Sequence, residues 1–302
     1  MEYKKLNFLR KWILKYTDRA AYIKYKGTVE DMIFYDQTKL LVHPSLIHPY
    51  KSLTSFVHSG NCGDIIYSLP TIFELSKNGE AQLFLKLNQP GKYNNYHPLG
   101  NVMLNNKIAE MLIPLMLYQP TIQSCKTFDN EQVDYDLDLF RTYTILQTRG
   151  NISRWYFYVY AISPSLHNPW LIAPKMNGLE EYIVIARSHR YRSPMIDYGF
   201  IKKYPKLIFI GVEEEYEDMK KMIPNIEFRK VKDFLEMASI INSCKFFIGN
   251  QSFPFSIAEG LKVKRLLEVY FNSPNVNVEG KGGYDFMYQP QFEKLVDDLY
   301  KN

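Results

Sequence analysis

Three short segments of the chain carry residue types and spacings that could do chemistry. The first, residues 59–64, reads Ser-Gly-Asn-Cys-Gly-Asp and follows a short apolar run. Its two glycines allow backbone N–H groups to approach a ligand, and a helix that begins there attracts negative charge at its N-terminus. We therefore predict that Asn61, Gly63 and Asp64 face a site, with helix capping by Asp64 as the alternative.

The second segment is rich in arginine. Residues 186–193 read Ala-Arg-Ser-His-Arg-Tyr-Arg-Ser and follow a strongly apolar strand pattern. Arginine binds phosphate oxygens in a bidentate manner, and open α/β sheets bind their ligands at the carboxyl ends of strands. We predict that this loop binds phosphate, with a solvated basic loop as the alternative. The residues concerned are Arg187, Ser188, Arg190 and Arg192.

The third segment joins a buried strand to a helix through a polar turn. Within residues 246–261, Asn250, Gln251 and Ser252 follow the run Phe-Phe-Ile-Gly, and a proline then favours the first turn of a helix. Glu259 lies inside that helix, where a carboxylate could accept both hydroxyls of a ribose. We predict that these four polar residues bind a nucleotide, and the alternative for Glu259 is an exposed place on the helix.

Three aspartates, Asp134, Asp136 and Asp138, alternate in residues 133–140, which have the two-residue period of a strand. This period predicts three carboxylates on one face, a set that could hold Mg²⁺. No further ligand cluster accompanies them, and the six histidines show no metal-binding spacing. We therefore predict no metal ion and no cofactor, and we assign Asp138 to the wall of the site.

The elements that must position these segments alternate between strand and helix in both halves of the chain. In the first half, the predicted strands are residues 56–57, 82–87 and 133–140, and the predicted helices are residues 65–75, 102–118 and 152–162. In the second half, the predicted strands are residues 182–186, 207–211, 226–231, 246–249 and 266–270, and the predicted helices are residues 196–204, 214–223, 232–243, 254–261 and 291–300. Apolar strands that alternate with helices indicate an α/β protein with two Rossmann-like, doubly wound domains facing a cleft.

Prolines and asparagines near the middle of the chain indicate a linker between the two domains. The predicted parts are residues 1–54 as a basic helix with a β extension, 55–165 as the first domain, 166–178 as the linker, 179–285 as the second domain and 286–302 as a C-terminal helix. Residues 4–20 have the spacing of an amphipathic helix. Short β-like pieces follow at residues 22–25, 32–35 and 40–42.

The positive charge of the chain is concentrated near its N-terminus. The net charge is +5, but residues 1–26 hold eight Lys and Arg against two acidic residues, a balance of +6, so the remaining residues sum to −1. A neutral body argues against a broad nucleic-acid-binding face. The basic residues 4–20 leave an anionic membrane surface or a nucleic-acid backbone as partners, and docking of this helix on the protein itself is the alternative.

Several features of the sequence indicate a cytoplasmic protein. No apolar run reaches the roughly 18–20 residues of a membrane span, and the N-terminus lacks the apolar core of a signal peptide. The three cysteines, Cys62, Cys125 and Cys244, are far apart, as expected in a reducing compartment. Peripheral attachment to the inner face of the membrane is compatible with these features.

Two of the three segments resemble the GT-B glycosyltransferases of glycosyltransferase family 9, whose best-known members are the ADP-heptose lipopolysaccharide heptosyltransferases. Residues 63–70, Gly-Asp-Ile-Ile-Tyr-Ser-Leu-Pro, look like the N-terminal Gly-Asp loop of that family. Residues 248–258 look like its C-terminal nucleotide loop, although Gln251 replaces an aspartate, Phe253 a glycine and Ser256 a histidine. These departures leave the donor nucleotide and the donor sugar open.

The resemblance implies a metal-independent, inverting glycosyltransferase. Asp64 would be its catalytic base, the second domain would hold a nucleotide-diphosphate sugar, and the first would hold a glycan or lipid-linked acceptor in cell-surface glycan synthesis. Three alternatives stay open: a sugar-nucleotide epimerase, a glycosyltransferase of hydroxymethylpyrimidine DNA bases that uses the basic N-terminus, and a non-catalytic nucleotide-binding relative.

Overall fold

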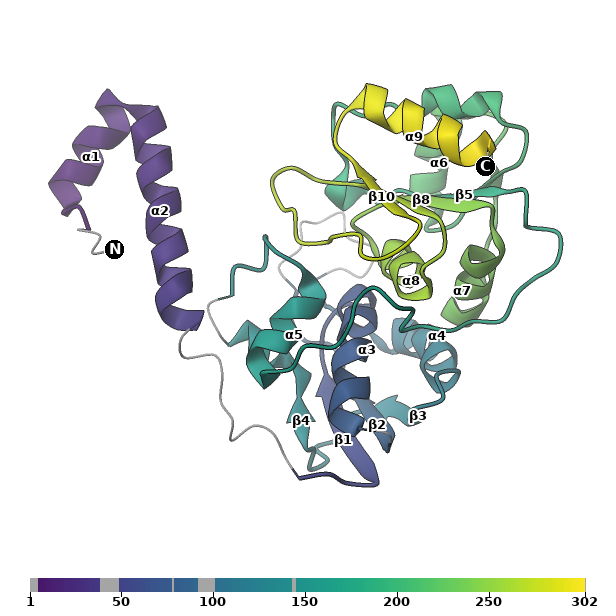
Figure 1. The fold of residues 1–302 in the computed structure, drawn as a ribbon, viewed down its shortest axis with the longest axis horizontal. Helices are drawn as coiled ribbons and strands as arrows, with labels where there is room; N and C mark the ends of the chain where they lie inside the picture. Colours follow the sequence, from purple (N-terminus) through teal and green to yellow (C-terminus); the bar gives the residue numbers. More distant parts are fainter. Residues whose placement is uncertain (1–4, 39–48, 78, 92–100, 143–144, 302) are drawn as a thin grey trace.

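The computed structural model describes residues 5–38, 49–77, 79–91, 101–142 and 145–301. Two α/β units lie one above the other in Figure 1, and a helical arm from the N-terminus projects to one side. Each unit is built on a sheet whose strand pairs are all parallel. The predicted fold class, α/β with two Rossmann-like units, is confirmed.

The first sheet has the strand order β3-β2-β1-β4. Its strands are β1 (Leu53–His58), β2 (Glu80–Leu85), β3 (Ile122–Thr127) and β4 (Tyr135–Asp136), and the helices of this unit are α3 (Cys62–Ser76), α4 (Asn106–Leu117) and α5 (Ile152–Tyr160). β3 was not predicted from the sequence. It is an edge strand on which only two of six residues are buried, so it lacks the apolar run of an inner strand.

The strand predicted over residues 133–140 is wrong for most of its length. β4 has only two residues, and a 3₁₀ helix, η2 (Leu137–Arg141), follows it directly. The Asp136 carboxylate accepts a hydrogen bond from the Asp138 N–H at 2.9 Å and so caps the 3₁₀ turn. The alternating aspartates are therefore not one face of a strand.

The second sheet has the order β10-β9-β8-β5-β6-β7. Its strands are β5 (Ile183–Ala186), β6 (Leu207–Phe209), β7 (Glu227–Phe228), β8 (Phe246–Asn250), β9 (Arg265–Glu268) and β10 (Gly283–Phe286), and its helices are α6 (Glu213–Met222), α7 (Phe234–Ser243), α8 (Phe253–Leu261) and α9 (Gln289–Lys301). Counted from β5, this is the 3-2-1-4-5-6 order of dinucleotide-binding folds. β10 was not predicted, and the helix predicted at 196–204 is a short 3₁₀ helix, η4 (Gly199–Lys203).

The two units share one apolar core. Ile65 and Leu69 of α3 belong to the same cluster of buried side chains as Phe255 and Ala258 of α8. A second cluster lies on the other side of the second sheet, where Phe286 stacks on Phe292 of α9 at a ring distance of 4.0 Å. Burial of apolar surface between α3 and α8 therefore fixes one unit against the other.

The chain that connects the units packs closely on α8. The N–H groups of Trp170 and Leu171 both donate to the Gly260 carbonyl, at 3.0 and 3.1 Å. A Cβ built on Gly260 would lie 2.8 Å from the Leu171 Cβ, which is closer than two such atoms approach. The absence of a side chain at Gly260 therefore permits this contact.

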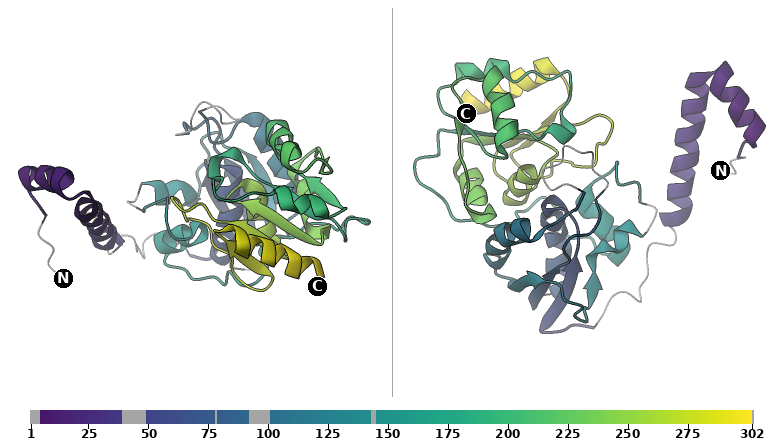
Figure 2. Two further views of the ribbon diagram at one scale, coloured as in Figure 1. Left: turned by 90° about the horizontal axis from the view of Figure 1, so that it is seen from above. Right: turned by 180° about the vertical axis from the view of Figure 1, so that it is seen from behind.

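The N-terminal arm consists of α1 (Phe8–Thr17) and α2 (Arg19–Thr38), and it projects to one side of the body in Figures 1 and 2. The β-like pieces predicted at 22–25 and 32–35 are wrong, since both lie in α2, and the piece at 40–42 falls outside the described residues. Asp18 splits the helix predicted over 4–20: its extended backbone ends α1, and its carboxylate accepts the Ala21 N–H at 2.9 Å. Within the described ranges, no helix has both the length and the apolar character needed to cross a bilayer.

A buried group of charges ties α8 to β9. Glu259 is 1% exposed, and its carboxylate accepts hydrogen bonds from the Arg265 Nε at 2.5 Å and from the Lys262 ammonium. The same carboxylate accepts the Glu279 N–H at 3.1 Å. The sequence-based assignment of Glu259 to a ribose is therefore corrected, because its carboxylate neutralises cations inside the protein.

We expect Glu259→Ala to lower the free energy of unfolding by about 3–5 kcal/mol, because Arg265 would be left buried without its carboxylate. Urea denaturation measures this change. Glu181→Ala is the matched control: its carboxylate is 63% exposed beside Lys245, and its loss should cost less than about 1 kcal/mol. A Glu259→Ala protein of normal stability that no longer binds nucleotides would restore the ribose assignment.

Candidate active site

The loops at the carboxyl ends of the two sheets meet where α3 and α8 begin. A Cβ built on Gly63, the second residue of α3, would lie 3.8 Å from the Phe253 Cα and 3.9 Å from the Ser256 Oγ of α8. The structure therefore brings the first and third sequence segments into contact. Two helix N-termini at one place create a positive potential that suits an anion.

Asp64 lies in the first turn of α3, three residues after the N-cap residue Asn61. Its Oδ2 accepts a hydrogen bond from the Arg141 Nη2 at 2.7 Å, and its side chain is 17% exposed. The Arg141 Nε also lies 3.4 Å from an oxygen of Asp138, whose other oxygen accepts the Ser59 N–H at 2.8 Å. Asp64 and Asp138 are thus held on either side of one guanidinium.

The charge of Arg141 is secured by these carboxylates. Burial alone would lower the pKa of its guanidinium, but the neighbouring Asp64 carboxylate raises that pKa above its ordinary value. A Cβ built on Gly60 would lie 2.6 Å from the Arg141 Nη2, so a side chain at residue 60 would displace the guanidinium from its present position.

His58 supports this loop from beneath and is completely buried. Its Nδ1 accepts the Gly60 N–H at 2.8 Å, so the ring carries its proton on Nε2, which lies 2.8 Å from the Tyr156 hydroxyl. The Tyr156 hydroxyl in turn donates to the Asp64 carbonyl at 3.1 Å. Burial lowers the pKa of His58, although the Asp138 carboxylate opposes this shift. Both nitrogens of this neutral imidazole form hydrogen bonds within the protein. His58 therefore positions the loop, and neither nitrogen is available to take a proton from an acceptor hydroxyl.

Arg187 forms its hydrogen bonds inside the protein. Its guanidinium donates to both oxygens of Glu268, from Nε at 2.7 Å and from Nη2 at 2.8 Å, and Nη2 also donates to the carbonyls of Ser193 and Ile196. The Arg187 side chain is 5% exposed and that of Glu268 is fully buried. The phosphate role predicted for Arg187 is therefore corrected, since this bidentate pair joins the ends of β5 and β9.

Ser188 and Asn250 bind each other at the ends of β5 and β8. The Asn250 Oδ1 accepts the Ser188 N–H at 3.0 Å, and its Nδ2 donates to the Ser188 carbonyl at 2.7 Å. Asn250 is fully buried. The two predicted ligands therefore hold the second and third segments together.

The remaining arginines of the second segment, Arg190 and Arg192, make fewer described contacts than Arg187. The Arg192 Nη1 lies 3.2 Å from an Asp218 oxygen, and its Nε is buried without a hydrogen-bond partner among the described residues. The guanidinium of Arg190 lies 4.9 Å from the ring centre of Tyr191. Burial raises the pKa of Tyr191, and the Asp64 carboxylate adds to this rise, so this loop and Asp64 interact electrostatically.

Gln251 and Ser252 organise the start of α8. The Gln251 amide donates to the Ser273 carbonyl at 2.6 Å and to the Asn275 side chain at 2.8 Å, and it accepts the Tyr270 N–H at 2.6 Å. Gln251 therefore holds the loop after β9, which corrects its assignment as a nucleotide ligand. Ser252 is the N-cap residue of α8, and its hydroxyl makes no capping bond to the helix.

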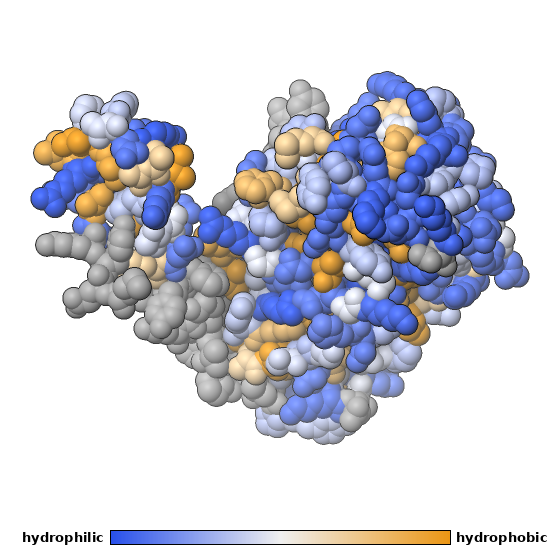
Figure 3. All heavy atoms as spheres, turned by 45° about the horizontal axis from the view of Figure 1, so that its top comes forward, coloured by the Kyte–Doolittle hydropathy of each residue, from blue (hydrophilic) through white to orange (hydrophobic). Residues whose placement is uncertain are grey.

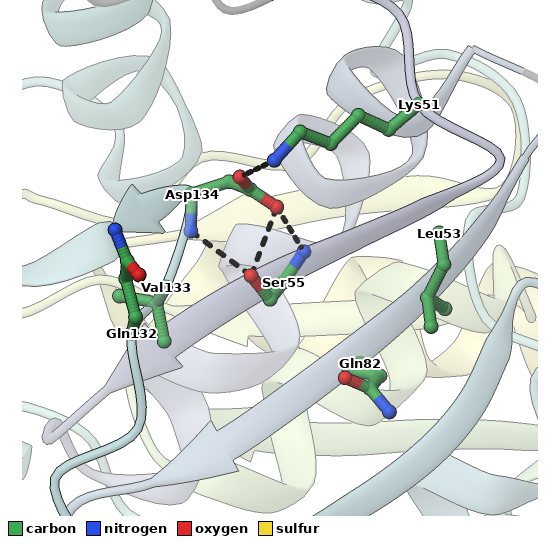
Figure 4. A pocket seen from close by; sticks show the side chains of 7 residues that line it. All are labelled: Lys51, Leu53, Ser55, Gln82, Gln132, Val133 and Asp134. Carbon is green, nitrogen blue, oxygen red and sulfur yellow. Dashed lines mark hydrogen bonds and ion pairs between the residues drawn. The ribbon is translucent and has the colours of Figure 1, made fainter.

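The three predicted aspartates do not form one cluster. Asp134 lines a hollow of about 500 Å³ at the amino end of β1, where it accepts two 2.9 Å hydrogen bonds from Ser55 and pairs with Lys51 (Figure 4). Partial burial alone would raise the pKa of Asp134, but these hydrogen bonds hold it below its ordinary value. Asp138, in η2, lies near the opposite, carboxyl end of β1, where it accepts the Ser59 N–H. Among the residues that the structure describes, no group of three or more His, Cys, Asp and Glu could hold a metal ion.

Sequence reasoning missed two residues that organise the site. Glu268 carries a detectable signal, because a glutamate in an apolar strand needs a buried cation as its partner. Arg141 carries no such signal. It comes near Asp64 only through the 3₁₀ turn that replaces the predicted strand.

Comparison with known proteins finds similarity in the fold. No family model and no curated protein sequence matches the chain. A solved family 9 glycosyltransferase from Veillonella parvula matches with a TM-score of 0.55 and 11% identity over 82% of this chain and 97% of that one. The E. coli heptosyltransferase WaaC with ADP matches with a TM-score of 0.57 and 10% identity over 82% of this chain and 99% of that one. E. coli ADP-heptose lipopolysaccharide heptosyltransferase II matches with a TM-score of 0.53 and 10% identity over 82% of this chain and 98% of that one. At these identities, the chain has the GT-B-like fold of family 9 glycosyltransferases, the family that its sequence segments resemble.

Proposed function

We propose that this protein is a GT-B glycosyltransferase that moves a sugar from a nucleotide-diphosphate donor to an acceptor hydroxyl with inversion. One observation carries the proposal: the first turn of α3, which carries Asp64, lies beside the start of α8 at Gly63, and the Asp64 carboxylate contributes to the raised pKa of Tyr191. The turn that bears this carboxylate is thus next to the elements of the second unit that we propose bind the diphosphate. The shared fold supports this reading by analogy.

The second unit is the donor side in this proposal. Because Arg187, Gln251 and Glu259 are engaged inside the protein, the diphosphate is held by Arg190, Arg192 and the N-terminus of α8. The negative charge of the diphosphate grows as its bond to the sugar breaks, and guanidinium groups stabilise that charge without a metal ion. Structural neighbours with ADP and with an ADP-linked heptose analogue favour a nucleotide diphosphate as the leaving group.

The first unit is the acceptor side, with Asn61, Gly63 and Asp138 around the base. Asp64 takes the proton of an acceptor hydroxyl while the hydroxyl oxygen attacks the anomeric carbon and the bond to the diphosphate oxygen breaks on the opposite face. Arg141 orients the Asp64 carboxylate through its 2.7 Å hydrogen bond. We propose a glycan or lipid-linked acceptor, used in cell-surface glycan synthesis on the cytoplasmic side of the membrane.

A donor screen tests the proposal. The full chain is heated with ADP-, UDP-, GDP-, CMP- and dTDP-linked sugars, and we expect one of them to raise the stability by about 2.7 kcal/mol at a hundredfold excess over its Kd. Binding without any turnover would instead identify a non-catalytic relative, and conversion of the donor without acceptor would identify an epimerase. If no nucleotide sugar binds, the donor site proposed above is wrong.

Asp64→Asn separates base catalysis from helix capping. Asparagine caps a helix about as well as aspartate, so the variant should fold and bind donor normally. If Asp64 is the base, transfer should fall roughly 10²–10⁴-fold, as measured by initial rates at saturating donor. Glu74→Gln, the same change at an exposed position of α3, should transfer at the rate of the unmodified protein. Near-normal transfer by Asp64→Asn would remove Asp64 from the mechanism.

The affinity for the donor should depend on pH through Glu215. Burial raises the pKa of Glu215 to about 7, although the His189 N–H and Arg192 oppose the shift, and Glu215 accepts that N–H at 3.1 Å within the proposed diphosphate loop. Below pH 7 Glu215 is protonated. Above pH 7 its negative charge opposes the diphosphate, so affinity should fall by roughly fivefold from pH 6 to 8, the ~1 kcal/mol that a nearby like charge costs.

Calorimetry at three pH values measures this dependence. Glu215→Gln keeps an acceptor for the His189 N–H, so its affinity should stay nearly constant across the range. The contact of His189 with Asp218, at 3.0 Å, is the same in both proteins. Glu214→Gln, an exposed neighbour on α6, should retain the full pH dependence. Equal slopes in Glu215→Gln and the unmodified protein would place the diphosphate away from this loop.

A further inference from the structure

One face of α1 exposes a continuous set of large apolar side chains. They recur with helical spacing, fall within one sector of the helix and are between 46 and 81% exposed. The residues are Phe8, Leu9, Trp12, Ile13 and Tyr16. None of the ten residues of α1 is buried, so this apolar face has no cover within the described part of the chain. We name this set the apolar face of α1.

The opposite side of α1 is already used. Leu14, the apolar residue outside that sector, is half-buried, and the Tyr25 hydroxyl of α2 accepts the Leu6 N–H at 3.0 Å. Arg149 of the body pairs with Glu30 and Asp31 near the far end of α2. The contacts described here therefore bring α2, and not the apolar face of α1, against the body.

Basic side chains surround this face. α1 contains Arg10, Lys11 and Lys15 and no acidic residue. Residues 5–26 hold seven Lys and Arg against Asp18 alone, whereas the charges of residues 27–302 sum to −1. Figure 3 shows hydrophobic and hydrophilic side chains next to one another over the arm. Apolar and cationic groups on one helix match a surface that is apolar inside and anionic outside.

We propose that the arm docks α1 onto an anionic lipid bilayer, with its helix axis along the surface and its apolar face below the headgroups. Trp12 and Tyr16, whose rings are 4.9 Å apart, occupy the interfacial zone that aromatic residues favour. The flanking cations reach the headgroups with their apolar stems against the bilayer. This inference is independent of the proposed catalytic function.

Charge decides between this occupant and the others. A second copy of the arm would bring two strongly positive surfaces together, at a cost in like-charge repulsion. A nucleic-acid backbone matches the cations but gives no burial to five large apolar side chains. An anionic bilayer accommodates both sets of groups at once.

Trp12 reports directly on this docking. The chain has three tryptophans, of which Trp155 and Trp170 are buried whereas Trp12 is 54% exposed. With vesicles that contain phosphatidylglycerol, the full chain should show a blue-shifted emission, protection from iodide quenching and co-flotation. Vesicles of phosphatidylcholine alone, or high salt, should weaken binding at least tenfold, because exposed charges are screened.

Matched variants separate the two sets of groups. Arg10→Glu, Lys11→Glu and Lys15→Glu together should lower partition at least tenfold. The same changes at Lys202, Lys206 and Lys220, exposed on the second unit, should leave it unchanged. The pair Leu9→Gln and Ile13→Gln keeps the charge and the helix-forming tendency, and it should abolish the blue shift. Circular dichroism and urea denaturation confirm that each variant is folded.

Three results would overturn the proposal. The first is flotation of the charge-reversed variant as readily as the unmodified protein. The second is a dimeric protein whose Trp12 emission is already blue-shifted before vesicles are added. This result would make a second copy of the chain the occupant of the apolar face of α1. The third is salt-sensitive binding to duplex DNA together with no partition into anionic vesicles.

Discussion

The packing of α3 against α8 is the contact on which the arrangement of the site depends. Each helix begins at the carboxyl end of an inner strand of its own sheet, and their buried side chains belong to one apolar cluster. The two helices are in van der Waals contact at their N-termini, where a Cβ built on Gly63 would lie 3.8 Å from the Phe253 Cα. Because this contact is apolar and extensive, it fixes the separation of the two helix N-termini.

The second constraint is the cost of buried charge. Arg187 with Glu268, and Glu259 with Arg265, are pairs in which each member is almost fully buried. Removal of either partner would leave an uncompensated charge in a region of low dielectric constant. These pairs therefore join β5 to β9 and α8 to β9, and their charges are already balanced within the protein. The polar chemistry left near the meeting point belongs to Asp64, Arg141 and the outer part of the arginine loop.

The N-terminal arm follows a different principle from the body. Its helices bury few side chains, and its charge is strongly positive where that of the body is close to zero. Amphipathic helices gain most of their stability from the surface against which their apolar face packs. The arm is thus the part of the chain for which we propose an external partner surface.

Much of this protein can be predicted from local sequence. The uninterrupted apolar runs of β5 and β8 mark inner parallel strands, and the glycines before α3 and the proline in α8 mark helix starts at their carboxyl ends. These patterns depend only on neighbouring residues, so they suffice for the α/β class, the position of the three segments and the resemblance to a fold family. They fail where the local pattern is ambiguous: α2 is rich in aromatic and β-branched residues that also suit strands.

The tertiary structure decided which polar residues face a ligand and which support the fold. Arg187, Gln251 and Glu259 have the right residue types in the right segments, yet each side chain binds a partner that lies 20 or more residues away. Arg141 meets Asp64 across 77 residues of sequence because β4 stops after two residues. A side chain's role depends on the charge and space that surround it, and distant segments supply both only when the chain is folded.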